Sequence, residues 1–437
     1  MRMYDILNKK RHNIPLMPEE IDYVVKNYTS GTLPDYQMSA LLVAIAINGM
    51  NDEEIFALTK SMVNSGEIAD LSQIRGIKVD KHSSGGVGDK TSPIIGAIVA
   101  SCGVPVAKMS GRGLGFSGGT VDKLESIPGY SVEISKERFF EIVNTVGVSI
   151  IGQTGNLAPA DKKIYQLRDV TATVDSIPLI ASSIMSKKIA GGADRILLDV
   201  KVGNGAFMKE LDSAIELAEK MVLIGKHFNK KTIALITQMN NPLGRNIGNS
   251  LEVIEMIGVL KDGKPAILKE LCCTLAANML YLAEKGNEEE CERMALSALE
   301  SGSALQKFKD MITAHGGDAS VVDDTSRFPK AKFIQPVYAE QDGYIQQFDT
   351  EACGNASVVL GAGRENKQSS IDYTAGIRLE VEMGDYVKKG DVLAYLHTSN
   401  EETLERAKEL IKTGINIRIE KPQTLPLIYK KISSEDY

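Results

Sequence analysis

Two glycine-rich segments between Val79 and Thr120 constrain this chain more than any other feature. The first reads DKHSSGGVGDKTS from Asp80 to Ser92, and the second reads AKMSGRGLGFSGGT from Ala107 to Thr120. Glycine lets backbone N–H groups approach a ligand closely, and neighbouring lysines and hydroxyls complete a site for an anion. The two segments therefore predict a phosphate-binding site.

Neither segment is one of the familiar nucleotide-binding motifs. In the first, Asp89 separates Gly88 from Lys90, so the G-K-[ST] run of a P-loop is missing. In the second, Gly111, Gly113 and Gly115 alternate, and Ser117 rather than another glycine follows two residues later. The pattern favours a phosphate site outside the P-loop NTPase and Rossmann folds.

Composition excludes several classes of protein. A length of 437 residues predicts two or three domains, and the net charge of −7 argues against a nucleic-acid partner. The N-terminus lacks the apolar run of a signal peptide, and no stretch is apolar enough for a membrane span. The five cysteines are odd in number and scattered, which is typical of reduced thiols in a cytoplasmic protein.

The periodicity of the chain predicts three structural parts. The first seventy residues read as helices; Asp35 caps one helix that runs to Asn48, and Asn51 with Glu54 resembles a capping box. From Ile77 short apolar runs alternate with helical patterns, which favours an α/β domain with a largely parallel sheet. After Ser326 the sequence alternates apolar and polar residues between Gly-Asp turns, which predicts strands.

The long motifs resemble those of the thymidine/pyrimidine-nucleoside phosphorylase family, and of its bacterial pyrimidine-nucleoside members in particular. Besides the two loops, the likeness includes GNLAPADKKIYQLRDVTATVDSIPLIASSIMSKKIAGGADRILLDVKVGNGAFM, NNPLGRNIGNSLEVIE and the C-terminal LGAGR segment. It spans nearly the whole chain. It implies a small helical domain from residues 1–69 and 160–191 and an α/β phosphate-binding domain from 70–159 and 192–330. The remaining residues, 331–437, would form a C-terminal α+β subdomain similar to the biotinyl/lipoyl hammerhead.

The resemblance implies reversible phosphorolysis of uridine, thymidine and deoxyuridine to the free base and α-D-(2-deoxy)ribose 1-phosphate. The residues that it assigns to catalysis are His82, Arg168 and Lys187. Those assigned to phosphate are Lys81, His82, Ser83, Ser92, Lys108, Met109, Ser110 and Thr120. Those assigned to the pyrimidine are Arg168, Ser183 and Lys187. Ser183 and Lys187 are four residues apart on a predicted helix and so share a face, whereas we expect Lys188 to point elsewhere.

Catalysis is then expected to need domain closure, because the phosphate residues and the base residues lie on different domains. Gly152 with Gly155 and Gly191 with Gly192 are candidate hinges. The resemblance also implies a homodimer that uses phosphate as co-substrate and needs no organic cofactor. Neither a nucleic acid nor a membrane is expected as a partner.

Two departures from the family pattern concern the loops. Phe116 and Ser117 replace the His-Thr pair common in the second loop, and this removes a polar contact near the sugar. In several bacterial members position 90 is a threonine in a potassium site, whose matching positions here are Gly88, Lys90, Leu243, Asn246 and Glu255. Two alternatives follow: the Lys90 ammonium replaces the ion by reaching Glu255, or the side chain points to solvent and potassium binds as usual.

Two other functions are compatible with parts of the chain. An anthranilate phosphoribosyltransferase-like enzyme shares the fold class and a glycine-rich phosphate loop, but would need diphosphate and magnesium. A non-catalytic carrier is suggested only by the C-terminal part, which lacks the Met-Lys-Met attachment sequence.

Overall fold

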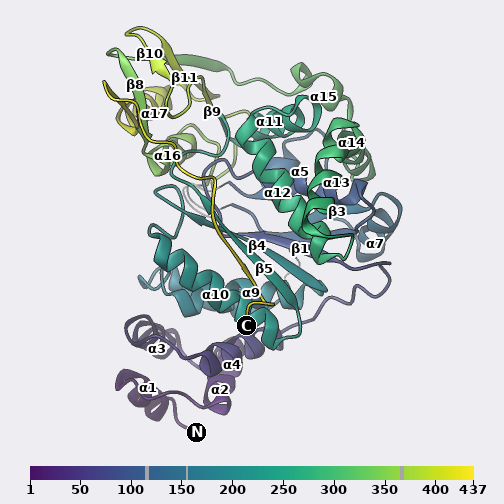
Figure 1. Cartoon of the computed structure of the whole chain (residues 1–437). Coiled ribbons are helices and arrows are strands. Elements are labelled where there is room, and N and C mark those ends of the chain that lie inside the picture. The colour runs from purple at the N-terminus through teal and green to yellow at the C-terminus, as the bar shows by residue number, and fades with distance from the viewer. Residues whose placement is uncertain (114–117, 154–155, 365–368) are drawn as a thin grey trace.

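The computed structural model describes residues 1–113, 118–153, 156–364 and 369–437. N-terminal helices lie at one end of the molecule, a sheet flanked by helices lies in the middle, and a β-rich C-terminal part lies at the other end (Figure 1). This confirms the predicted fold class of a small helical domain, a larger α/β domain with a mostly parallel sheet, and a C-terminal α+β part. Every described helix is too short or too polar to cross a bilayer.

Six helices form the helical end of the molecule. They are α1 (Met3–Arg11), α2 (Pro18–Thr29), α3 (Asp35–Asn48), α4 (Asp52–Val63), α8 (Pro159–Arg168) and α9 (Ile177–Ala190). The predicted capping box starts α4: the Asn51 side chain accepts a hydrogen bond from Glu54 N, and the Glu54 carboxylate accepts one from Asn51 N, each at 2.9 Å. Ile164 of α8 and Leu179 of α9 share one buried apolar cluster with the N-terminal helices. The chain thus returns to this end before it completes the sheet.

The central sheet has the strand order β1-β4-β5-β13. Its strands are β1 (Val79–Ser83), β4 (Arg195–Val202), β5 (Lys231–Gln238) and β13 (Ile428–Ser433). The first three are parallel, and β13 is antiparallel to β5. Alternate residues of β4 bury against opposite faces, Leu197 toward α5 (Thr91–Ser101) and α12 (Ala266–Leu282), Leu198 toward α9 and α10 (Leu211–His227). Helix α9 therefore joins the helical end to the sheet.

A two-stranded parallel sheet places the second glycine loop beside the first. Strand β2 (Val106–Ser110) pairs with β3 (Val148–Gly152), with Lys108 opposite Ile150. The other helices of this domain are α6 (Thr120–Glu125), α7 (Lys136–Thr145), α11 (Asn249–Asp262), α13 (Glu288–Glu300), α14 (Ser303–Ala314), α15 (Ser320–Asp323) and the 3-10 turn η1 (Thr325–Arg327). Both glycine loops begin where a parallel strand ends, which is where such sheets bind ligands.

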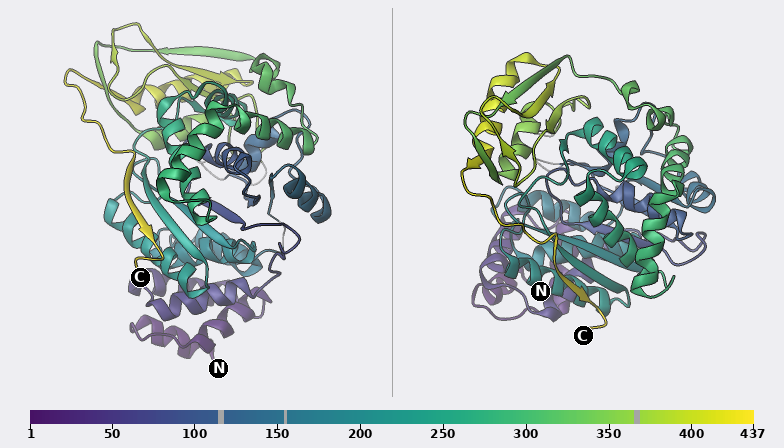
Figure 2. Two further views of the ribbon diagram at one scale, coloured as in Figure 1. Left: turned by 45° about the vertical axis from the view of Figure 1, so that its right-hand side comes forward. Right: turned by 45° about the horizontal axis from the view of Figure 1, so that its top comes forward.

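The C-terminal part has its own apolar core and two small sheets, of order β10-β8-β12 and β6-β9-β11-β7. Its elements are β7 (Phe333–Tyr338), β8 (Gly343–Phe348), α16 (Thr350–Val359), β9 (Gly376–Leu379), β10 (Tyr386–Val387), β11 (Val392–Thr398), η2 (Glu401–Thr403), α17 (Leu404–Gly414) and β12 (Ile415–Arg418). Two strands cross between this part and the central domain: β6 (Asn246–Ile247) pairs with β9, and β13 pairs with β5. Figure 2 shows β13 leaving the C-terminal part to lie along the central sheet. The last strand thus lies in the sheet of the α/β domain, although the sequence grouped it with 331–437.

Candidate active site

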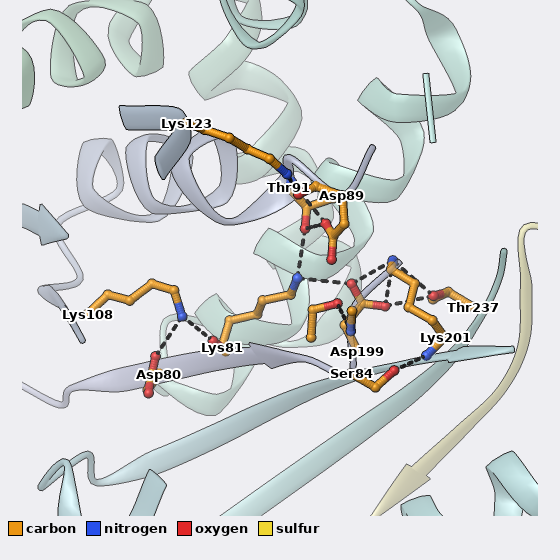
Figure 3. Close-up of polar contacts among 12 residues, drawn as sticks. Asp80, Lys81, Ser84, Asp89, Thr91, Lys108, Lys123, Asp199, Lys201 and Thr237 are labelled. Atoms are coloured by element: carbon orange, nitrogen blue, oxygen red, sulfur yellow. Dashed lines mark hydrogen bonds and ion pairs between the residues drawn. The ribbon is translucent and has the colours of Figure 1, made fainter. Parts of the chain in front are cut away.

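The two glycine loops meet through a lysine from β2. Lys108 Nζ donates to the backbone carbonyl of Lys81 at 2.6 Å, so the ends of β1 and β2 are held together (Figure 3). The first loop follows Ser83 and ends where α5 begins at Thr91. The second follows Ser110, and its described residues resume before α6 begins at Thr120. Hydroxyls and backbone N–H groups from both loops therefore lie at one edge of the strands.

An uncompensated positive charge lies between these strands. Lys188 Nζ is 2.6 Å from Asp80 Oδ2, and Lys108 Nζ is 3.5 Å from Asp80 Oδ1, so two buried lysines share one carboxylate. Burial lowers the pKa of Lys108 to about 8, although the attraction of Asp80 opposes this shift. Burial raises the pKa of Asp80, but Lys188 and Lys108 outweigh it and hold that pKa below its usual value. A bound anion would complete the charge balance of this group.

Deeper in the sheet the charges are balanced, because two lysines, Lys81 and Lys201, interact with two carboxylates, those of Asp199 and Asp89. Lys81 Nζ lies 3.0 Å from Asp199 Oδ2 and donates to Thr91 Oγ1 at 2.7 Å (Figure 3). Lys201 Nζ is 2.8 Å from the same carboxylate oxygen. Burial raises the pKa of Asp199, but Lys201 and Lys81 bring it below the usual value. The Lys81 ammonium is thus engaged inside the protein, and what Lys81 presents toward the second loop is its backbone.

His82 is half-buried next to this positive charge. Burial, followed by the repulsion of Lys188 and Lys108, holds the pKa of His82 well below the usual histidine value. The imidazole is therefore neutral at neutral pH, with one ring N–H to donate and one nitrogen lone pair. The other residues assigned to phosphate are half-buried at the strand and helix ends that flank the loops: Ser83, Ser92, Met109, Ser110 and Thr120.

Ser183 and Lys187 share a face of α9, as their spacing predicts. Lys187 Nζ donates to Ser183 Oγ at 2.9 Å and to Asp161 Oδ2 of α8 at 2.5 Å. Arg168 is buried, and its guanidinium donates to three backbone carbonyls, those of Thr173, Leu179 and Val174, at 2.8–3.2 Å. Three of its five N–H groups therefore hold the turn between α8 and α9, and the other two are the ones that remain for a ligand.

The residues of the expected potassium site surround an ammonium group. Lys90 Nζ donates to the carbonyls of Leu243 and Asn246, both at 2.7 Å, and to Glu255 Oε2 at 2.5 Å. The Lys90 side chain is fully buried, so it does not point to solvent. A β-carbon on Gly88 would lie 2.9 Å from the Leu243 carbonyl oxygen and 3.4 Å from Lys90 Nζ. The two carbonyls and the one carboxylate of the expected potassium site are thus occupied by the Lys90 ammonium. These residues do not fit a metal ion in addition to Lys90.

The carboxylate of Asp122 connects the second loop to the C-terminal part. Asp122 of α6 accepts a hydrogen bond from Gly113 N at 2.7 Å, and Arg364 from the LGAGR segment reaches the same carboxylate at 3.1 Å. Phe116, Ser117 and Gly155, which the sequence singled out, lie outside the described residues. The C-terminal part therefore contacts the loop through Arg364.

Sequence reasoning missed the charged partners of the expected site residues. They are Asp80, Asp161 and Asp199, and the lysines Lys188 and Lys201 share two of these carboxylates. Lys188 leaves the face shared by Ser183 and Lys187, as expected, and this direction brings its ammonium to Asp80. A usable signal was present in RILLDVKV, where two charged residues interrupt an apolar strand and must pair when buried.

Comparisons with known proteins agree with the geometry. Residues 75–305 match the glycosyl transferase family a/b domain, 4–66 its helical bundle domain, and 344–418 the pyrimidine nucleoside phosphorylase C-terminal domain. The pyrimidine-nucleoside phosphorylase of Geobacillus stearothermophilus is 54% identical over 434 residues, which is 99% of this chain and 100% of that protein. The enzyme of the same name from Staphylococcus epidermidis is 52% identical over 436 residues and covers 100% of both chains.

Among solved structures, the crystal structure of anthranilate phosphoribosyltransferase from Thermus thermophilus matches with a TM-score of 0.58 and 18% identity. It covers 71% of this chain and 98% of its own. This likeness is one of fold alone. The identity over the full length and the three matched domains establish that this chain belongs to the pyrimidine-nucleoside phosphorylase family.

Proposed function

We propose that this protein catalyses the reversible phosphorolysis of pyrimidine nucleosides. A phosphate oxygen forms a bond to C1′ while the bond from C1′ to the base nitrogen breaks and its electron pair leaves with the base. The products are the free base, after it takes up a proton, and α-D-(2-deoxy)ribose 1-phosphate. The observation that carries the proposal is the unbalanced charge of Lys108 and Lys188 on Asp80, at the meeting point of two glycine loops.

We assign phosphate, the co-substrate, to the two loops. Lys108 supplies a charge, and the hydroxyls of Ser83, Ser92, Ser110 and Thr120 with loop N–H groups supply donors. Because Lys81 Nζ is bound to Asp199 and Thr91, its share in this site comes from the backbone. No organic cofactor enters this reaction.

The base belongs on the α8–α9 side, with Arg168, Ser183 and Lys187 as donors to its carbonyl and ring-nitrogen atoms. As the glycosidic bond lengthens, negative charge grows on the base and oxocarbenium character grows on the sugar. The neutral His82 offers its N–H to O2 of the base at that stage. Donors aimed at developing charge are worth roughly 10²–10³ in rate each.

The chemistry is tested with three nucleosides. Purified protein is mixed with uridine, thymidine or deoxyuridine, with and without phosphate, and base release is followed by the change in ultraviolet absorbance. We expect release only with phosphate, and values of kcat/KM for ribose and deoxyribose substrates within about a thousandfold, because Phe116 cannot hydrogen-bond the sugar. Release at an equal rate without phosphate would identify a hydrolase, and no release would refute the proposal.

We also propose that the protein is a homodimer that acts in the cytoplasm. The cytoplasmic location is supported by the five cysteines, which are all free, because disulfides persist mainly in oxidising compartments. The homodimer is supported by three exposed apolar residues of α3, namely Tyr36, Val43 and Ile47. They are 74%, 41% and 76% exposed and lie seven and four residues apart, so they form an apolar stripe on one helix face.

A further inference from the structure

Lys90 makes the contacts of a coordinated cation rather than those of an ordinary ion pair. An ammonium has three N–H donors, and here each has its own oxygen acceptor at 2.5–2.7 Å. Two acceptors are backbone carbonyls of the 243–246 segment and the third is the carboxylate of Glu255 on α11. The Lys90 side chain is 0% exposed and that of Glu255 6%, so water does not complete this shell.

The surrounding backbone is shaped around this group. Gly244 has a φ of +80°, and a β-carbon there would lie 2.5 Å from Glu255 Oε2. Glu255 also accepts hydrogen bonds from Arg245 N at 2.7 Å and Asn246 N at 3.2 Å. The carboxylate is therefore held by the same segment that supplies the two carbonyls, and these three oxygens form one cage around the Lys90 ammonium.

A second buried lysine fastens the same loop to the same helix. Lys123 Nζ donates to the Asp89 carbonyl at 2.6 Å and lies 2.7 Å from Glu252 Oε2. Glu252 and Glu255 are three residues apart on α11, so the two pairs lie side by side. Lys90 itself directly precedes α5, whose first turn carries Thr91 and Ser92. The cage thus positions the start of the helix that carries Ser92, which we assign to phosphate.

We infer that Lys90 is a covalently tethered replacement for the monovalent cation that the family resemblance implies, so that this enzyme folds and works without potassium. A metal ion in the cage would compete for the same three oxygens and would stand beside the lysine charge. The ammonium is a compact charge on a flexible stem, which suits it to this position. The activity part of this inference rests on the proposed function, whereas the stability part does not.

The unmutated protein provides the first test. Thermal unfolding and phosphorolysis are measured in choline, sodium and potassium chloride at equal ionic strength. We expect melting temperatures within about 1 °C and rates within about twofold across the three salts. A specific rise of several degrees, or a several-fold stimulation by potassium over sodium, would overturn the inference. If no phosphorolysis is detected, the proposed function fails while the melting series still decides the inference.

Two variants test the replacement directly. Lys90→Thr leaves Glu255 and two carbonyls without a cation, so its melting temperature in choline is expected to fall by roughly 5 °C or more. Potassium is then expected to restore stability with a saturable concentration dependence, and sodium less so. Lys123→Thr is the matched control, since it removes the other buried lysine that pairs with a glutamate of α11 but leaves only one carbonyl beside that glutamate.

We expect the Lys123→Thr control to be destabilised without specific recovery in potassium. A folded Lys90→Thr protein that potassium does not restore, or an equal recovery in the Lys123→Thr control, would contradict the inference. If Lys90→Thr does not fold, the three-salt series on the unmutated protein still decides it.

Discussion

At the scale of single residues, Lys108 is the group whose charge responds to pH in the working range. Burial lowers its pKa to about 8, and only its protonated form attracts phosphate. We therefore expect kcat/KM for phosphate to fall above pH 8 as the ammonium deprotonates. His82, whose pKa lies well below the usual value, is already neutral at pH 6.5 and adds no acid limb there.

The test compares the wild type with Lys108→Arg between pH 6.5 and 9.5. Arginine keeps its charge throughout this range, so the ratio of variant to wild-type kcat/KM for phosphate is expected to rise roughly tenfold per pH unit above 8. The ratio cancels the titration of phosphate itself. Lys108→Met is expected to raise the phosphate KM most at pH 6.5, and its difference from the wild type is expected to shrink above pH 8 as Lys108 itself loses its charge. Parallel profiles for wild type and arginine variant would show that Lys108 does not carry this charge.

Residue types were easier to predict than residue partners. The lysines, serines and histidine of the loops could be predicted as site residues, because glycine-rich segments with such neighbours indicate an anion site. The partners of Lys81 and Lys187, which are Asp199 and Asp161, could not be predicted, because each ion pair joins segments far apart in the chain. Side-chain direction decided the outcome for Lys90 as well, where the sequence left two alternatives open.

At the scale of elements, the second glycine loop depends on the C-terminal part. Arg364 reaches Asp122 at 3.1 Å, and Asp122 holds Gly113 N. Removing a charged hydrogen bond costs roughly 1.5–3 kcal/mol, so Arg364→Ala is expected to raise the phosphate KM by about tenfold or more. The nucleoside KM is expected to change little, because the base residues lie on α8 and α9.

Arg378→Ala is the control for this measurement. Arg378 belongs to the same C-terminal part but pairs with Glu380 at a half-exposed site on β9. We expect its kinetics to match those of the wild type. Equal losses in both variants would mean that the C-terminal part acts only through general stability, and an unchanged phosphate KM in Arg364→Ala would remove the assigned role of this arginine.

Local signals also explain which elements could be predicted. Helix α3 ends at Asn48 as expected, although Pro34 and not Asp35 occupies its N-cap position. Helix α4 starts at its predicted capping box, because caps and helical periodicity are encoded by neighbouring residues. The pairing of β13 with β5 could not be read in this way. It joins the last strand to one that lies nearly two hundred residues earlier, and nothing local marks an added antiparallel edge.

At the scale of the whole molecule, the apolar stripe on α3 predicts a dimer. Light scattering at micromolar concentration is expected to give about twice the chain mass of 47.4 kDa. The double variant Tyr36→Glu, Ile47→Glu places two charges in the stripe and is expected to give the monomer mass with an unchanged circular dichroism spectrum. Ile419→Glu, at an 87% exposed residue of the C-terminal part, should remain dimeric. A monomeric wild type, or a folded double variant that is still dimeric, would exclude this interface.

In the proposed reaction the two glycine loops deliver inorganic phosphate to the sugar carbon of a pyrimidine nucleoside. The most direct measurement follows the phosphorus resonances of a mixture of uridine, phosphate and enzyme while uracil is quantified in the same sample. We predict that the inorganic phosphate signal decreases as one sugar-phosphate ester signal grows, with one ester formed for each uracil released. Uracil release without the ester, or an unchanged phosphate signal while uridine is consumed, would contradict the account.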